Sequence, residues 1–193
     1  LNKLKITKED FLPDYSCEIC SDTGYITQDT ITIMCNCLKQ KLFDAEYNKA
    51  NMGNLSKDTF ENFNINLFSN EVNKQKYEST VSPRENMEDI KNSCLKFVEN
   101  FDNPDGKNLL FSGSTGLGKT YLSNAIVSKL IEKGYTVLYQ TAPVMLDSIL
   151  DYRFGKNNEF NYNDLLNVDL LIIDDLGTES SNNMKFSELF NIL

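Results

Sequence analysis

The feature that most constrains this fold is the eight-residue stretch Gly113–Thr120, which reads Gly-Ser-Thr-Gly-Leu-Gly-Lys-Thr. It follows the G-x-x-x-x-G-K-[ST] pattern of a phosphate-binding loop. The apolar run 108–112 before it suits a buried strand, and the segment 121–133 after it has the apolar spacing of a helix. A strand, a glycine loop and a helix in this order predict an α/β fold with a parallel sheet and flanking helices.

The residue types of this loop suit a nucleoside triphosphate. Glycines accept backbone angles that turn successive N–H groups toward phosphate oxygens, and the following helix directs its positive end to the same place. Lys119 adds a full charge for the phosphates, and Thr120 offers a hydroxyl to Mg²⁺. A glycine-rich turn that binds nothing is the alternative. The predicted ATP-binding residues are Gly113, Ser114, Thr115, Gly116, Leu117, Gly118, Lys119 and Thr120.

A second stretch, 169–177, is an apolar strand that ends in two carboxylates, Asp174 and Asp175. This is the pattern of a Walker B strand. Mg²⁺ prefers oxygen ligands and keeps several waters, so Asp174, Thr120 and the phosphates would suffice to hold it. Asp175 is then the candidate for polarising the attacking water, and Lys119, Asp174 and Asp175 are the predicted catalytic residues. A core strand that ends in an acidic turn is the alternative.

Four of the five cysteines lie in a short segment, as Cys17-x-x-Cys20 and Cys35-x-Cys37, and the chain has no histidine. A turn at 21–24 and a β-hairpin or two short strands over 25–34 would bring the pairs together. Tetrahedral Zn²⁺ takes four thiolates in closed structural sites, so these cysteines are the predicted zinc ligands. Disulfides, an iron–sulfur cluster and idle thiols are the alternatives. Cys94 is predicted to be a buried helix residue.

Composition limits the classes of partner. The chain has 193 residues, 40% of them hydrophobic, and a net charge of −9, so it suits one domain with a small appendage and no generic affinity for nucleic acid. No apolar run approaches the ~20 residues of a membrane span, and no signal peptide is visible, so a cytoplasmic protein is expected. The chain starts at Leu1 and stops within an apolar helical pattern, which suggests a fragment.

The chain divides into three predicted parts. Residues 1–53 form a cysteine-rich zinc module with a helix over 38–52 that Gly53 and Asn54 end, 54–81 form a linker that lies on the nucleotide domain, and 82–193 form a partial ATPase core. In the core, Ser82 and Glu85 predict a capping box, 136–140 a strand, and Thr141 with Pro143 the start of a helix. The apolar positions predicted for a last helix are Phe186, Leu189, Phe190 and Leu193.

The segment 151–163 combines aromatic side chains with some of the few cations of this acidic chain. Bases stack on aromatic rings, and cations follow a nucleic-acid backbone, so the segment is a candidate single-stranded DNA contact. Packing of the same rings against a helix is the alternative. The residues concerned are Tyr152, Arg153, Phe154, Lys156, Phe160 and Tyr162.

Together these motifs resemble the AAA+ ATPases of the DnaC/DnaI helicase-loader group and their relatives, the IstB-type transposition helpers. The resemblance rests on the cysteine box, on Thr59-Phe60-Glu61-Asn62-Phe63, on the phosphate loop and on Asp174-Asp175-Leu176-Gly177-Thr178-Glu179. It covers most of the chain. IstB-type helpers usually lack the cysteine box, which favours a loader.

The resemblance implies an ATP-controlled protein of DNA replication that loads a replicative DNA helicase onto single-stranded DNA and self-associates through its AAA+ domain. It also implies that the cysteine segment engages the helicase. The sensor strand, arginine finger and lid of that family are absent before Leu193, so hydrolysis is expected to be weak in this fragment. Two further readings stay open, a P-loop kinase of small molecules and a zinc-stapled adaptor with a vestigial ATP site.

Overall fold

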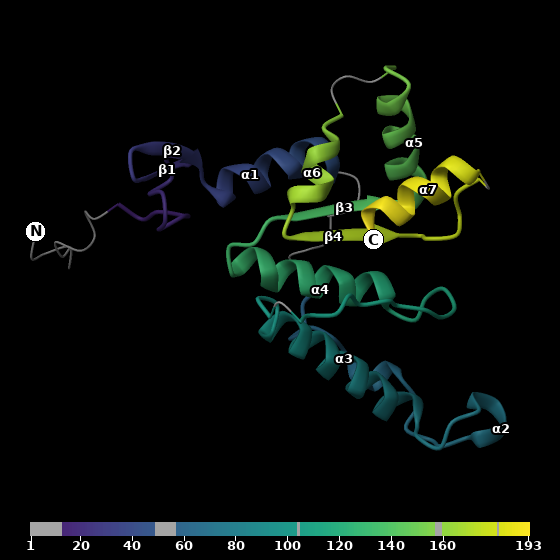
Figure 1. Ribbon diagram of the computed structural model, residues 1–193. Coiled ribbons are helices and arrows are strands. Elements are labelled where there is room, and N and C mark those ends of the chain that lie inside the picture. Colours follow the sequence, from purple (N-terminus) through teal and green to yellow (C-terminus); the bar gives the residue numbers. More distant parts are fainter. Residues whose placement is uncertain (1–12, 49–56, 104, 157–159, 181) are drawn as a thin grey trace, which may run out of the picture.

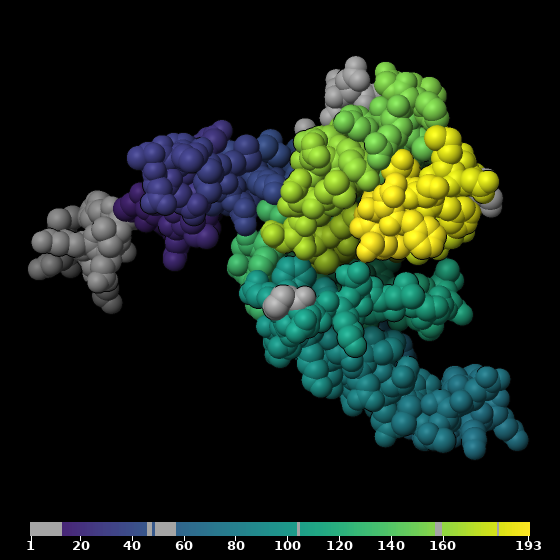
Figure 2. All heavy atoms as spheres, in the orientation of Figure 1, coloured from purple at the N-terminus to yellow at the C-terminus, as the bar shows by residue number. Residues whose placement is uncertain are grey.

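A computed structural model describes residues 13–48, 57–103, 105–156, 160–180 and 182–193. The N-terminal part contains an antiparallel hairpin of β1 (Tyr25–Gln28) and β2 (Ile31–Met34), followed by α1 (Asn36–Phe43) and a short π-helix, η2 (Asp44–Asn48). This confirms the hairpin expected over 25–34. Figure 2 shows this part standing out from one side of the α/β core. The last residues of the helix predicted over 38–52, and Gly53 and Asn54 that were predicted to end it, lie outside the described residues.

The core is a three-layer arrangement around two parallel strands (Figure 1). β3 (Val137–Thr141) pairs with β4 (Leu170–Asp174) in the register Val137↔Leu170 to Thr141↔Asp174. On one face lie α3 (Pro83–Glu99) and α4 (Lys119–Glu132), and on the other lie α5 (Ala142–Arg153), α6 (Tyr162–Asn167) and α7 (Asn183–Ile192). The alternation of strands and helices therefore gives a parallel pair with helices on both faces.

Each face of the sheet has its own apolar cluster because successive strand residues point to opposite sides. Val137 and Tyr139 pack with α3 and α4, and Leu138 packs with α5 and α6. The segment before α3 contributes Phe60, which is 3% exposed, together with a 3-10 turn, η3 (Ile65–Leu67) and a single helical turn, α2 (Lys74–Tyr77). Phe60 is thus part of the first cluster, and Phe63, Ile65 and Phe68 pack against it.

Local signals set the helix ends as the sequence predicts. Ser82 accepts from the Glu85 N–H, and the Glu85 carboxylate accepts from the Ser82 N–H at 2.8 Å, which completes the capping box. Cys94 is 1% exposed on the inner face of α3, and burial raises the pKa of its thiol to about 11. It is a packed core residue, as expected.

The strand expected over 108–112 is not formed. Leu110 is 82% exposed, and a groove of about 1160 Å³ lies between 107–113 and β4, whose residues line its other wall. A strand needs a neighbour within hydrogen-bonding distance, and among the described residues β4 is paired only with β3. The segment therefore leads into the phosphate loop without ladder bonds.

The buried face of the last helix, α7, also differs from expectation. Phe186, Phe190 and Leu193, which directly follows the helix, are 51%, 79% and 72% exposed. The helix instead packs on α5 through Leu189 and Ile192, and its buried Lys185 forms an ion pair with Asp147 at 2.7 Å. Helical spacing alone does not show which apolar face of a helix packs against another element.

The outer edge of β3 is closed by side chains from the N-terminal part. Gln40 accepts from the Val137 N–H at 2.6 Å and donates to the Val137 carbonyl at 3.0 Å. Asn48 accepts from the Tyr139 N–H at 2.7 Å and also donates to the Val137 carbonyl at 3.0 Å. We call Gln40 and Asn48 the amide clamp. It replaces the hydrogen bonds of a neighbouring strand, and it fixes α1 and η2 to the sheet.

Candidate nucleotide site and cysteine cluster

The phosphate loop folds as its sequence predicts. Gly113, Gly116 and Gly118 all have positive φ, at 145°, 79° and 90°, a region that side chains rarely enter. Gly118 is also the N-cap of α4, so the helix begins at Lys119 with its free N–H groups at the loop. This is the geometry of an anion site at a helix N-terminus.

Lys119 and Thr120 lie where the loop chemistry requires them. The Lys119 ammonium donates to the carbonyls of Gly113 at 3.0 Å and Ser114 at 2.9 Å, so its charge is held directly over the loop. The Thr120 hydroxyl donates to Asp174 Oδ2 at 3.3 Å. Residues 54 positions apart are therefore brought together, because the phosphate loop and the end of β4 meet at the same edge of the core.

Asp174 is held from three directions. Its Oδ2 accepts from the Tyr139 phenol at 2.5 Å as well as from Thr120, and its Oδ1 accepts from the Asp175 N–H at 2.9 Å. Burial, and next the hydrogen bond to Asp174, raise the pKa of Tyr139 far above its ordinary value, so the phenol remains a donor at every physiological pH. Sequence reasoning missed this contact, because Tyr139 has the pattern of an ordinary core residue in an apolar strand.

Asp175 directly follows β4 and is exposed at the groove that Lys119 and Asp174 also line. Its φ of 54° is unusual for a residue with a side chain. The Thr178 hydroxyl donates to its carbonyl at 2.8 Å, which closes the turn that holds this conformation. The sequence-predicted catalytic residues thus share one groove.

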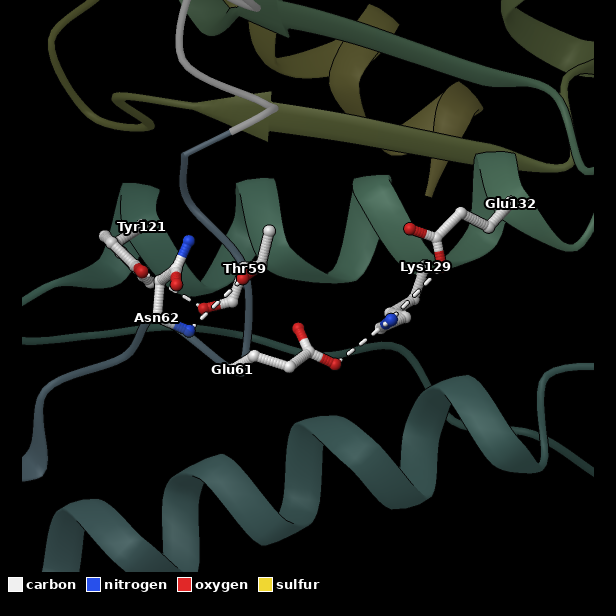
Figure 3. Close-up of polar contacts among 6 residues, drawn as sticks. All are labelled: Thr59, Glu61, Asn62, Tyr121, Lys129 and Glu132. Carbon is white, nitrogen blue, oxygen red and sulfur yellow. Dashed lines mark hydrogen bonds and ion pairs between the residues drawn. The ribbon is translucent and has the colours of Figure 1, made fainter.

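A short segment, 57–63, is attached to α4 next to the loop (Figure 3). The Tyr121 phenol donates to the Thr59 carbonyl at 3.0 Å, and Lys129 forms an ion pair with Glu61 at 3.1 Å. Phe63 packs on the Tyr121 ring at 5.4 Å between centroids. The motif Thr59–Phe63 therefore attaches the segment to α4 at Tyr121, near the start of the helix, and at Lys129, near its end.

The four predicted zinc ligands form a single cluster. The sulfurs of Cys17, Cys20, Cys35 and Cys37 all lie within 4.8 Å of one another. Cys17 Sγ lies 3.9 Å from Cys35 Sγ, and Cys20 Sγ lies 3.4 Å from Cys37 Sγ. These separations exceed a disulfide bond of about 2.05 Å and lie on both sides of the ~3.8 Å sulfur–sulfur edge of a tetrahedron with Zn–S bonds of about 2.3 Å. The donor set therefore fits a four-thiolate metal site.

The backbone around the cluster is shaped for these sulfurs. Gly24 N–H donates to Cys20 Sγ at 3.3 Å, and a side chain at Gly24 would meet Leu38 at 2.8 Å. Burial opposes ionisation of Cys20, but the Gly24 N–H and the neighbouring thiols lower its pKa to about 7. Burial, and then the Cys20 thiol, raise the pKa of Cys37 to about 12.

The aromatic and basic segment 151–163 is largely occupied by its own contacts. Arg153 forms a two-pronged ion pair with Glu188 of α7 at 3.1 and 3.2 Å, and its guanidinium lies 4.9 Å from the Tyr162 ring centre. Tyr152 stacks on Tyr162, and Phe160 is 6% exposed. Arg153 therefore joins α5 to α7. Phe154 remains 57% exposed.

A known protein family matches this chain. The family model described as IstB-like ATP binding protein matches residues 54–193. The chain belongs to this family. The assignment supports ATP binding and confirms the resemblance inferred from the motifs. None of the helices in the described part of this IstB-like protein has the length and apolar content to cross a bilayer.

Curated relatives of this IstB-like protein include replicative helicase loaders. It is 37% identical over 87 residues to the replicative helicase loader DnaC of Escherichia coli K12, covering 44% of this chain and 35% of the loader. DnaC of Buchnera aphidicola subsp. Baizongia pistaciae is 38% identical over the same shares. An ATP-binding protein of insertion sequence IS1162 from Pseudomonas fluorescens is 36% identical over 74 residues, covering 36% of this chain and 30% of that protein. The chain spans about a third of the length of these relatives.

Proposed function

We propose that this protein binds Mg²⁺–ATP between the phosphate loop and the end of β4 and hydrolyses it. The observation that carries the proposal is the contact between Thr120 and Asp174 at 3.3 Å beside the Lys119 ammonium. Thr120 and Asp174 would hold Mg²⁺, which neutralises charge on the β- and γ-phosphates, and Lys119 would exchange its loop carbonyls for phosphate oxygens. Asp175 would orient the attacking water.

The test is nucleotide affinity and turnover in Lys119→Ala. Removing a fixed charge from the phosphates should weaken binding or turnover by more than about 10-fold. Lys74→Ala, an exposed lysine on α2, is the matched control and should behave as wild type. Equal affinity and turnover in wild type and Lys119→Ala would contradict the proposal.

We further propose that ATP controls the loading of a replicative helicase onto single-stranded DNA by the complete protein. The DnaC relatives support this reading, and the cysteine cluster distinguishes the chain from IstB-type transposition helpers, which are the second candidate because of the IS1162 relative. Self-association through the ATPase part belongs to the same proposal. A small-molecule kinase is less well supported, because both arginines of the chain serve the fold: Arg84 donates to the Phe68 carbonyl, and Arg153 pairs with Glu188.

The loading proposal is tested with the complete protein, the replicative helicase of the same cell and circular single-stranded DNA. Helicase transferred to DNA should depend on ATP and be lost in Lys119→Ala. Phe154→Ala with Lys156→Ala should lower DNA affinity and flatten its salt dependence, since both side chains are exposed and their removal spares the Arg153 ion pair. Stimulation of a transposase without helicase transfer would favour the transposition reading instead.

A further inference from the structure

Tyr139 combines a buried ring with a polar end directed at the metal carboxylate. The residue is 1% exposed, and its ring packs in the cluster formed with α3 and α4. Its hydroxyl reaches Asp174 Oδ2 at 2.5 Å. In the strand register Tyr139 lies opposite Ile172, so the phenol extends along the strands to the residue two positions further on β4. A buried hydroxyl without a partner is costly, and here the partner is the carboxylate proposed to serve Mg²⁺.

The second observation is the arrangement of the other donors on this carboxylate. Thr120 donates to the same oxygen from the start of α4, and the Asp175 N–H donates to the other oxygen. Only the phenol comes from β3, and the amide clamp fixes that strand through Asn48 and the Tyr139 N–H. The core and the edge of the sheet thus fix the strand from which the phenol extends.

We propose that Tyr139 is a positioning residue for magnesium: its phenol holds the Asp174 carboxylate in the orientation that faces Thr120. The inference rests on the proposed function, since it assigns Asp174 to the metal. An aspartate at the end of a strand can rotate about its side-chain bonds, and a hydrogen bond to a fixed donor removes that freedom before the metal arrives. Partners of this kind orient metal ligands, and their loss usually lowers metal affinity about 10- to 100-fold.

The experiment compares Tyr139→Phe with wild type in the complete protein. Phenylalanine keeps the buried ring and removes only the hydroxyl. Binding of a fluorescent ATP analogue is titrated with Mg²⁺, and again in EDTA. The Mg²⁺ concentration for half-maximal binding should rise by about 10-fold in the variant, while nucleotide affinity in EDTA stays within about twofold of wild type. A residue with a purely structural role would change both quantities or neither.

Two controls separate the outcomes. Tyr135→Phe changes another tyrosine, just before β3, whose ring packs on Phe101 at 4.8 Å, and it should keep the wild-type Mg²⁺ requirement. In an Asp174→Asn background, Tyr139→Phe should have no further effect on Mg²⁺, because it acts through Asp174.

The results distinguish this inference from the proposed function. Absence of Mg²⁺-dependent nucleotide binding in wild type would refute the proposed function. Wild-type binding with an unchanged Mg²⁺ requirement in Tyr139→Phe would refute the positioning role alone. Loss of cooperative unfolding in Tyr139→Phe would also overturn it, since the hydroxyl would then serve the fold. An effect on the Mg²⁺ requirement that persists in the Asp174→Asn background would overturn it as well, since the hydroxyl would then not act through Asp174.

Discussion

Gln40 of the amide clamp makes two hydrogen bonds to the backbone of Val137. This side chain is 6% exposed and gives Val137 both an acceptor for its N–H and a donor for its carbonyl. Gln40→Met keeps the length and most of the volume of the side chain but removes both hydrogen bonds. Val137 is fully buried, so its N–H would lose its partner without access to water.

The magnitude follows from these two bonds. A buried backbone N–H left without a partner costs about 1–3 kcal/mol, and the lost bond to the Val137 carbonyl about 1 kcal/mol at most, because Asn48 still donates to that oxygen. Gln40→Met should therefore lower the free energy of unfolding by roughly 1–4 kcal/mol. For a chain of this size the melting temperature should fall by roughly 2–16 °C.

Thermal unfolding followed by circular dichroism measures the loss, and hydrogen exchange on the β3 peptide locates it at Val137. Lys41→Met, an exposed change on the same helix, is the matched control and should leave both quantities unchanged. Gln40→Glu restores the acceptor but brings a carboxylate against Asp44, which now accepts from Gln40 at 2.8 Å, so it should not rescue stability. A Gln40→Met protein with wild-type stability and unchanged exchange would refute the reasoning.

Three further predictions follow from the described geometry. Elemental analysis should give about one zinc per chain, and the four clustered thiols should be protected from alkylation until a chelator is added. Gly24→Ala should weaken that protection, because its new side chain would meet Leu38 at 2.8 Å. A metal-free protein with two disulfides would contradict the zinc prediction. The Ser82 N–H and hydroxyl lower the pKa of Glu85, so its stabilising effect is present above the ordinary carboxyl range and is lost as pH falls through the lowered pKa. Glu85→Gln should accordingly melt below wild type at pH 7, with the difference shrinking in acid, and a constant difference would argue against the charge. Asp175→Asn in the complete protein should keep ATP affinity and lose turnover, and normal turnover would reassign the water-orienting role.

The sequence pattern was sufficient to predict the structure wherever the residues that determine it lie within one short segment. The loop glycines, the Ser82–Glu85 box and the cysteine spacing each specify a backbone conformation or a ligand set within a few residues, and each is found where the sequence predicts it. The predictions that were wrong concern which other element a strand pairs with or a helix packs against. Residues 108–112 have the composition of a strand but no ladder in the described chain, and Phe190 has helical spacing but is 79% exposed. Periodicity gives the shape of an element and leaves open what it packs against.

The phosphate-binding loop, the acidic strand end and the four-thiol cluster could all be predicted from sequence, because each is encoded by residue types at short, fixed separations. The contacts between distant groups could not be predicted, because they depend on how the chain folds. Tyr139 reaches Asp174 through the register of two parallel strands, and Gln40 reaches Val137 across 97 positions of the chain. Such contacts depend on how strands and helices dock, and a side chain gives no local sign that its hydrogen-bond partner lies on another element.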